Sequence, residues 1–135
     1  MDAHEAALLA ANEAFYEAFN RRDIARMDSL WASNAPVACA HPGWAALIGR
    51  EEVMESWRAI LDNPRAPRIR LKDPKAHLYG DAGFVLCIEE IGRTAVLATN
   101  VFAREQGEWK LVHHHAGAVS PRAPESPTPS PRDMN

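Results

Sequence analysis

Three consecutive histidines near the end of the chain are the residues best suited to chemistry. His113, His114 and His115 carry imidazole groups, which gain or lose a proton near neutral pH and can act as an acid, a base or a metal ligand. On a β-strand, His113 and His115 share one face and His114 takes the other. By the same alternation, Trp109 and Leu111 fall on the face of His113 and His115. Val112 and Ala116 fall on the face of His114, so the apolar pattern leaves open which histidine points into the protein.

A metal site at these histidines would need more than two ligands. His113 and His115 stand at positions i and i+2 and could both reach one ion, but a site also needs a third ligand and supporting hydrogen bonds. His41 and Glu89 are the only side chains that could complete it. Structural or interface histidines are the simpler interpretation. We expect no metal ion and no cofactor.

Two further polar groups interrupt apolar stretches that look like strands. Alternation places Glu89 and Glu90 on opposite faces. A carboxylate in an apolar cavity has a raised pKa and can exchange protons near neutral pH, whereas at a wet strand end it would be an ordinary surface group. Asn100 could donate to a substrate carbonyl or tie down a neighbouring strand. Glu89, Asn100 and His114 are therefore the candidate catalytic residues.

The tryptophans are candidates for the wall of a pocket. Trp44 belongs to the loop His41-Pro42-Gly43-Trp44, where it could cover a cavity, stack on a ligand or fill the open end of the fold. Trp31 and Trp57 fall on the apolar stripes of predicted helices. Core packing and cavity lining are both consistent with that position.

Helices that would position these groups are predicted in the first half of the chain. Apolar residues at helical spacing predict helices over 3–20 and 50–62. A shorter helix follows Asp23, whose carboxylate can cap its first turn.

Strands are predicted in the second half, where the apolar period changes to two. Asp73-Pro74 is expected to turn the chain, and the residue pairs 92–93 and 106–107 are expected to form hairpin turns. We predict strands over 37–40, 68–72, 76–79, 82–91, 94–104 and 108–119.

The three long strands carry apolar residues on both faces. Phe84, Leu86 and Ile88 share one face of the first long strand, and Val85 and Cys87 share the other. A sheet that is apolar on both faces must be covered twice. The helices supply one cover, and a second subunit is the simplest source of the other, so we expect a homodimer through the sheet.

Composition limits the class of protein. A chain of 135 residues forms one domain, and a net charge of −3 argues against a nucleic-acid partner. No apolar run reaches the roughly 20 residues that span a bilayer, and the first residues lack the features of a signal peptide, so we expect a cytoplasmic protein. Cys39 and Cys87 are expected to be buried thiols. Residues 1–119 should form the folded domain, and 120–135, with five of the ten prolines, a disordered tail.

Several segments resemble a known family. They are Phe15 to Asp23, Gly49 to Val53 with Trp57, Thr99 to Phe102, and Gly107 to His115. Together they resemble the nuclear transport factor 2-like superfamily, in its SnoaL-like and ketosteroid-isomerase-like branch. The last segment is also similar to the association domain of calmodulin-dependent kinase II. The resemblance covers about 85% of the chain, roughly residues 7–119.

This resemblance implies an α+β fold, a cone-shaped barrel in which three N-terminal helices pack on a curved, mostly antiparallel sheet. It implies a pocket between the helices and the concave face of the sheet, with His114 pointing inward. It also implies the pocket-lining residues Met27, Trp31, His41, Val53, Trp57, Glu89 and Asn100. The tyrosines and aspartates of this chain do not reproduce the oxyanion pair and base of ketosteroid isomerases, so steroid isomerisation is not expected.

Three functions are consistent with this pattern. The first is binding of a small, mostly apolar molecule, held by Trp31, Trp44, Trp57 and Phe102 and oriented by His41, Glu89, Asn100 and His114. The second is acid–base catalysis of the isomerase, cyclase or hydrolase type, with Glu89 or His114 as base. The third is a non-catalytic oligomerisation module.

Overall fold

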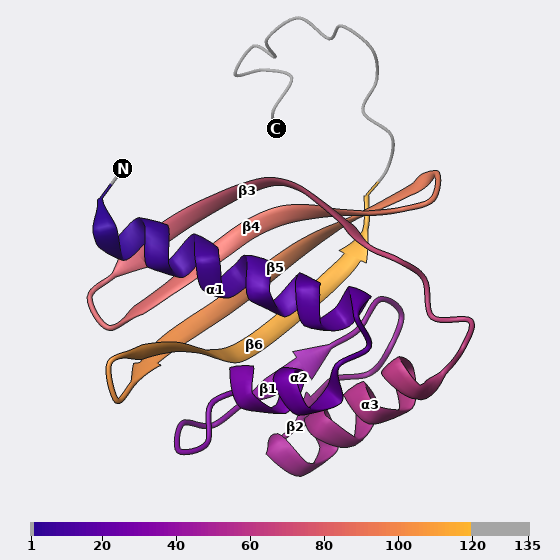
Figure 1. Ribbon diagram of the computed structural model, residues 1–135, viewed down its shortest axis with the longest axis horizontal. Helices are drawn as coiled ribbons and strands as arrows, with labels where there is room; N and C mark the ends of the chain where they lie inside the picture. Colours follow the sequence, from indigo (N-terminus) through magenta and orange to yellow (C-terminus); the bar gives the residue numbers. More distant parts are fainter. Residues whose placement is uncertain (1, 120–135) are drawn as a thin grey trace, which may run out of the picture.

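Three helices pack on one six-stranded sheet (Figure 1). The computed structural model describes residues 2–119. The helices are α1 (Ala3–Asn20), α2 (Ile24–Leu30) and α3 (Arg50–Asp62). The strands are β1 (Ala38–Ala40), β2 (Leu47–Ile48), β3 (Arg70–Tyr79), β4 (Ala82–Ile91), β5 (Thr94–Glu105) and β6 (Glu108–Ala118). The spatial order is β2-β1-β6-β5-β4-β3, and the sheet is open and curved. The predicted α+β class is confirmed.

The helices begin where the sequence offers capping groups. The Asp2 carboxylate accepts from the backbone N–H of His4 at 2.6 Å and of Glu5 at 3.2 Å, which starts α1. Asp23 accepts from the backbone N–H of Arg26 at 3.0 Å, which confirms its predicted role as the cap of α2. Within residues 2–119, no helix is both long and apolar enough to cross a membrane.

Three antiparallel hairpins build the large part of the sheet, from β3 to β6. Gly92 has a φ of 62° in the β4–β5 turn. Gln106 and Gly107 have φ values of 52° and 80° in the β5–β6 turn, and two positive φ angles match the twist of the flanking strands. Both predicted hairpin turns are confirmed. β1 pairs in parallel with β6, which aligns Cys39 with His114.

The predicted turn at Asp73-Pro74 is wrong. Residues 70–79 form one strand, β3, whose pairing with β4 shifts between Lys72 and Lys75. Asp73 has a φ of 52° there. A bulge in this edge strand accommodates Pro74, which has no N–H to donate. The short strand β2 was not predicted from the sequence.

A second irregularity changes the faces of β6. Val101 pairs with His113, but Phe102 pairs with Leu111, so one residue of β6 is left over. Trp109 and Leu111 on one side of this bulge are buried, as is His114 on the other side. The simple alternation that placed Trp109 and Leu111 on the face of His113 is therefore wrong, because an extra residue reverses the parity.

The two faces of the sheet are covered differently. Figure 1 shows the helices on one face, which we call the inner face, and α1 contacts β3, β4 and β6. Gly83 makes this packing possible, since a Cβ there would lie 2.8 Å from the Leu8 side chain. No described element covers the opposite, outer face, where Leu97 is 45% exposed.

Both cysteines are free and buried, as predicted. The predicted tail at 120–135 lies outside the described residues.

Candidate functional site

A cavity of about 280 Å³ lies between α1, α3 and the inner face of the sheet. Nine of its lining residues are apolar and three are polar. The apolar ones are Phe15, Phe19, Pro42, Trp44, Trp57, Ile60, Pro67, Ile69 and Ile91, and the polar ones are His41, Glu89 and His114. An apolar wall with a few convergent polar groups is the usual composition of a small-molecule site.

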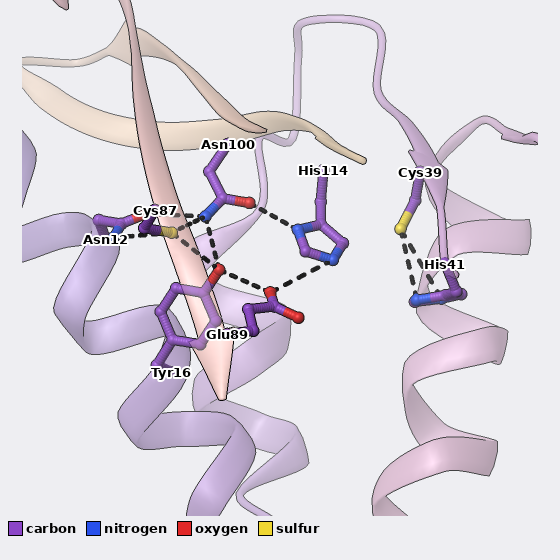
Figure 2. A network of polar contacts seen from close by, with 8 residues as sticks. All are labelled: Asn12, Tyr16, Cys39, His41, Cys87, Glu89, Asn100 and His114. Atoms are coloured by element: carbon purple, nitrogen blue, oxygen red, sulfur yellow. Dashed lines mark hydrogen bonds and ion pairs between the residues drawn. The ribbon is translucent and has the colours of Figure 1, made fainter. Parts of the chain in front are cut away.

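Glu89 is held on the inner face by a tyrosine from α1. Its side chain is 3% exposed, and the Tyr16 hydroxyl donates to Oε2 at 2.7 Å (Figure 2). Burial raises the pKa of Glu89, and the hydrogen bond from Tyr16 opposes that rise in part. The carboxyl group is thus moved toward the pH range in which it can exchange a proton.

Asn100 determines which ring nitrogen of His114 carries the proton. The Asn100 amide nitrogen donates to Asn12 Oδ1 at 2.8 Å and to the Tyr16 hydroxyl at 3.0 Å. Its carbonyl oxygen therefore faces His114 Nδ1, at 2.5 Å (Figure 2). Because a carbonyl only accepts, the hydrogen-bond network assigns the proton to Nδ1 and leaves Nε2 as a lone pair.

The free nitrogen of His114 faces the acid. His114 Nε2 lies 4.0 Å from Glu89 Oε2. Burial lowers the pKa of His114 to about 3, so the ring is neutral at pH 7. A neutral base and a carboxyl group with a raised pKa thus stand side by side at the wall of the cavity. This pair can accept and donate protons.

His41 is a second neutral imidazole at the cavity. The Ser56 hydroxyl donates to the Val53 carbonyl at 2.7 Å, so its oxygen accepts from His41 Nε2 at 2.9 Å. Burial lowers the pKa of His41 to about 4. The ring packs edge-on against Trp57 and Trp44, with centroid distances of 4.7 Å and 4.8 Å. His41 therefore forms part of an aromatic wall and supplies no positive charge near pH 7.

The structure brings together five of the residues predicted for the site, and they line the cavity: His41, Trp44, Trp57, Glu89 and His114. Asn100 is fully buried behind His114, and its carbonyl oxygen contacts His114 Nδ1. Four predicted lining residues lie in the hydrophobic core and are not among the cavity-lining residues: Met27, Trp31, Val53 and Phe102. Trp31 packs against Trp57 at 6.4 Å, which places it behind the wall.

Sequence reasoning missed the residues that support the polar groups. Asn12 and Tyr16 on α1 and Ser56 on α3 were not predicted. Asn12 is fully buried and lies one turn from Leu8 on the stripe that packs on the sheet. A polar residue at the centre of an apolar helical stripe is a signal that could have identified it.

Residues 2–119 contain no group of three or more His, Cys, Asp or Glu side chains that could hold a metal ion. A larger groove, of about 460 Å³, lies on the surface near Arg22 and Arg58. It contains none of the polar residues of the inner cavity, and Arg22 donates instead to the carbonyls of Asn63 and Ala66.

The helices, the curved open sheet and the cavity between them define the cone-shaped α+β class of the nuclear transport factor 2-like proteins. Residues 8–121 match the family of SnoaL-like domains, and the chain belongs to this family. The resemblance seen in the sequence is thereby confirmed.

Solved structures agree with this assignment. A candidate dehydratase of the NTF2-like family from Streptomyces avermitilis superimposes with a TM-score of 0.83 at 35% identity, covering 89% of this chain and 99% of that one. A candidate calcium/calmodulin-dependent protein kinase type II association domain from Thiobacillus denitrificans has a TM-score of 0.74 at 34% identity, covering 83% and 94%. A ketosteroid isomerase-like protein from Erwinia carotovora atroseptica, at 20% identity and a TM-score of 0.70, covers 90% and 100% and shares the fold.

A curated relative, the F-box protein SKIP8 of Arabidopsis thaliana, is 24% identical over 115 residues. The match covers 84% of this chain and 50% of that protein, so the chain spans about half the length of this relative.

Proposed function

We propose that the protein binds a small, mostly apolar molecule in the cavity between α1, α3 and the sheet. The observation that carries this proposal is the composition of the wall, nine apolar residues around His41, Glu89 and His114. The volume of about 280 Å³ lies just below the range of ligand pockets, which is about 300–1,000 Å³. A ligand with one ring system fits this space.

The test is native mass spectrometry of the protein after incubation with a small-molecule extract of its host cells and desalting. We expect the protein to carry a reproducible extra mass that is absent from the denatured spectrum. Ile60→Trp fills the cavity and should abolish the adduct. Ala59→Trp adds the same ring at the neighbouring, exposed position of α3 and should retain it. A wild-type protein without any adduct, or an adduct that survives Ile60→Trp, would contradict binding in this cavity.

A second candidate function, acid–base catalysis, is favoured by the 4.0 Å separation of His114 Nε2 and Glu89 Oε2. The relative from Streptomyces avermitilis is a candidate dehydratase, and loss of water from a β-hydroxy carbonyl compound needs both a base and an acid. His114 would take the proton from carbon. Glu89 would give its proton to the hydroxyl as the C–O bond breaks, which releases water. Proton return from His114 to Glu89 would then restore both groups.

This reaction is tested by incubating the protein in D₂O with the molecule that native mass spectrometry identifies as the adduct. We expect the wild-type protein to exchange a carbon-bound hydrogen of the ligand for deuterium or to change its mass by one water. His114→Gln and Glu89→Gln should each abolish this change while the ligand still binds. Unchanged exchange in both variants would exclude the pair as the acid and base.

We also propose that the protein is a homodimer through the outer face of the sheet. Half-buried apolar side chains follow this face along β4 and β5, among them Phe84, Leu86, Ile88 and Val101. Leu97 on the same face is 45% exposed. An exposed apolar surface of this kind is typical of a protein interface. A relative named as an association domain is consistent with assembly.

A further inference from the structure

We infer that the ligand of the cavity is an uncharged molecule that places a hydroxyl group between His114 Nε2 and Glu89 Oε2. This inference rests on the proposed binding function and specifies the chemical class of the ligand.

The spacing of the two polar atoms fits one bridging oxygen. His114 Nε2 and Glu89 Oε2 are 4.0 Å apart, which is too long for a direct hydrogen bond. An oxygen atom can stand about 2.8 Å from both of them at once, which is an ordinary hydrogen-bond length. Figure 2 shows these two atoms facing each other, with the second Glu89 oxygen taking part in no drawn contact. The pair is therefore arranged to receive an oxygen atom between its members.

The protonation of the pair restricts which oxygen it can receive. The Nδ1 proton of His114 is committed to Asn100 Oδ1, so Nε2 can only accept a hydrogen bond. Burial raises the pKa of Glu89, so the carboxyl group takes up a proton more readily than it would in solvent, and in that form it donates a hydrogen bond. A hydroxyl group donates to Nε2 and accepts from the acid. It is thus complementary to both members of the pair.

Other oxygen groups satisfy the pair less well. An ether oxygen can accept from Glu89 but leaves the Nε2 lone pair of His114 without a donor. A carboxylate fails for the same reason and also brings a negative charge toward a buried carboxyl group. A buried polar atom left without its partner weakens binding about tenfold to a hundredfold.

The rest of the cavity supplies no compensating positive charge. Its lining residues within the described chain include no lysine and no arginine. The second imidazole, His41, commits its Nε2 proton to Ser56, and burial lowers its pKa to about 4. An anionic ligand would therefore lose its hydration without gaining a counter-charge.

The walls favour a ring as the carrier of the hydroxyl. The Phe15 ring lies 5.1 Å from the His114 ring and 5.4 Å from the Trp57 ring, measured between centroids. Flat aromatic side chains thus line the cavity beside His114. A small phenol or alicyclic alcohol has the matching shape and polarity.

Calorimetric titration of the wild-type protein with four matched probes tests the inference. The probes are para-propylphenol, its methyl ether, para-propylbenzoate and para-propylbenzylamine, which share the ring and the chain and differ in the polar group. We expect the phenol to bind most tightly. The ether should bind about tenfold to a hundredfold more weakly, and the benzoate and the benzylamine should bind more weakly still.

Two variants locate and explain the preference. Ile60→Trp, or Ile91→Trp if the first variant does not fold, should abolish binding of the phenol by filling the cavity. Glu89→Gln keeps a hydrogen-bond donor at this position but cannot carry a negative charge, so it should reduce the preference for the phenol over the benzoate by about tenfold. Circular dichroism checks that each variant is folded.

The outcomes separate this inference from the proposed function. Binding of the ether, the benzoate or the benzylamine as tightly as the phenol, abolished by the cavity-filling variant, would overturn the hydroxyl inference and leave the binding function intact. If none of the four probes binds, or if binding is unaffected by Ile60→Trp and Ile91→Trp, both the inference and the proposed binding site fail.

Discussion

The two faces of the sheet differ in their exceptions to the usual burial pattern: the inner face buries polar groups, and the outer face exposes apolar ones. On the inner face, β4, β5 and β6 each place a polar residue beneath the helices, namely Glu89, Asn100 and His114, and all three are buried. On the outer face β4 and β5 carry mostly apolar side chains, and Leu97 is 45% exposed. Burial alone would favour the reverse arrangement. The three polar groups on the otherwise apolar inner face are consistent with ligand binding, and the apolar surface of β4 and β5 is consistent with assembly.

The three consecutive histidines of β6 show the difference between the inner and the outer face of the sheet. His114 points inward, is 3% exposed and has its Nδ1 proton held by Asn100. His113 and His115 lie on the outer side, with ring centroids 6.1 Å apart. His113 Nδ1 donates to the Ala38 carbonyl at 3.0 Å, which joins β6 to β1. The same side chain therefore serves as part of a site on one face and as a strand contact on the other.

The largest expected effect of a substitution comes from the inner network. Asn100→Leu retains the approximate size of the side chain but leaves Asn12 Oδ1 and His114 Nδ1 without their partner. Each unpaired buried group costs about 1–3 kcal/mol, so the free energy of unfolding should fall by about 2–5 kcal/mol. Urea denaturation followed by circular dichroism measures this change.

The neighbouring residue on the outer face provides the control. Thr99→Val is a similar exchange of a polar for an apolar group on the same strand, and it should change stability by no more than about 0.5 kcal/mol. Equal effects of the two substitutions would show that the inner hydrogen bonds contribute no special stability.

The acid sensitivity of the fold is the second test of the inner face. The pKa values of His114 and His41 are lowered to about 3 and about 4. Below pH 6.5 the unfolded chain binds protons that the folded state does not, so stability is lost as the pH falls from 6.5 toward 4. Each histidine contributes up to about 1.4 kcal/mol per pH unit in this range. Glu89 acts in the opposite direction, because its raised pKa gives a contribution that is lost as the pH rises.

His114→Gln isolates the contribution of one ring. Urea unfolding of the wild type and the variant at several pH values should give stability differences that shrink steadily between pH 6.5 and pH 4. A difference that is constant across this range would mean that His114 is already charged in the folded protein, contrary to its burial and its contact with Asn100.

The sequence predicted the elements well wherever local rules determine them. Asp23 caps α2, and the pairs 92–93 and 106–107 form hairpin turns, because capping and positive φ angles depend on residues close in the chain. The predictions failed at two bulges, one in β3 near Asp73 and one in β6 near Val112. A bulge depends on the pairing with the neighbouring strand, and the pattern of a single strand does not contain that information.

The candidate site was predicted in part for a similar reason. Glu89, His114 and Asn100 stand out because they are polar within apolar strands. Asn12 and Tyr16 lie on a helix that precedes them by more than 70 residues, and only the packing of α1 on the sheet brings their side chains to Asn100. Met27 and Trp31 were expected to line the pocket, but they lie in the core behind its lining residues. Whether a buried residue reaches the cavity depends on the packing of the whole fold, which a sequence pattern does not contain.

The third prediction concerns assembly by the outer face. Leu97→Asp introduces a charge within the proposed interface, where its burial would be costly. We expect the dissociation constant of the dimer to rise at least about tenfold. The thermal unfolding of the isolated subunit should change little, because Leu97 is 45% exposed. Size-exclusion chromatography with light scattering measures the mass as a function of concentration. A wild-type protein that is monomeric at micromolar concentration would exclude this use of the outer face.

The smallest effect on stability is expected at the boundary between the inner face and the solvent. Trp44 lines the cavity but is 49% exposed, and its ring packs against His41. Trp44→Ala should therefore alter the free energy of unfolding by no more than about 0.5 kcal/mol. It should nevertheless speed the dissociation of para-propylphenol, because the indole covers the cavity beside His41. Stopped-flow fluorescence measures that rate. Trp44→Phe, which retains an aromatic cover, should restore slow release, and equal rates in all three proteins would show that Trp44 does not control access to the cavity.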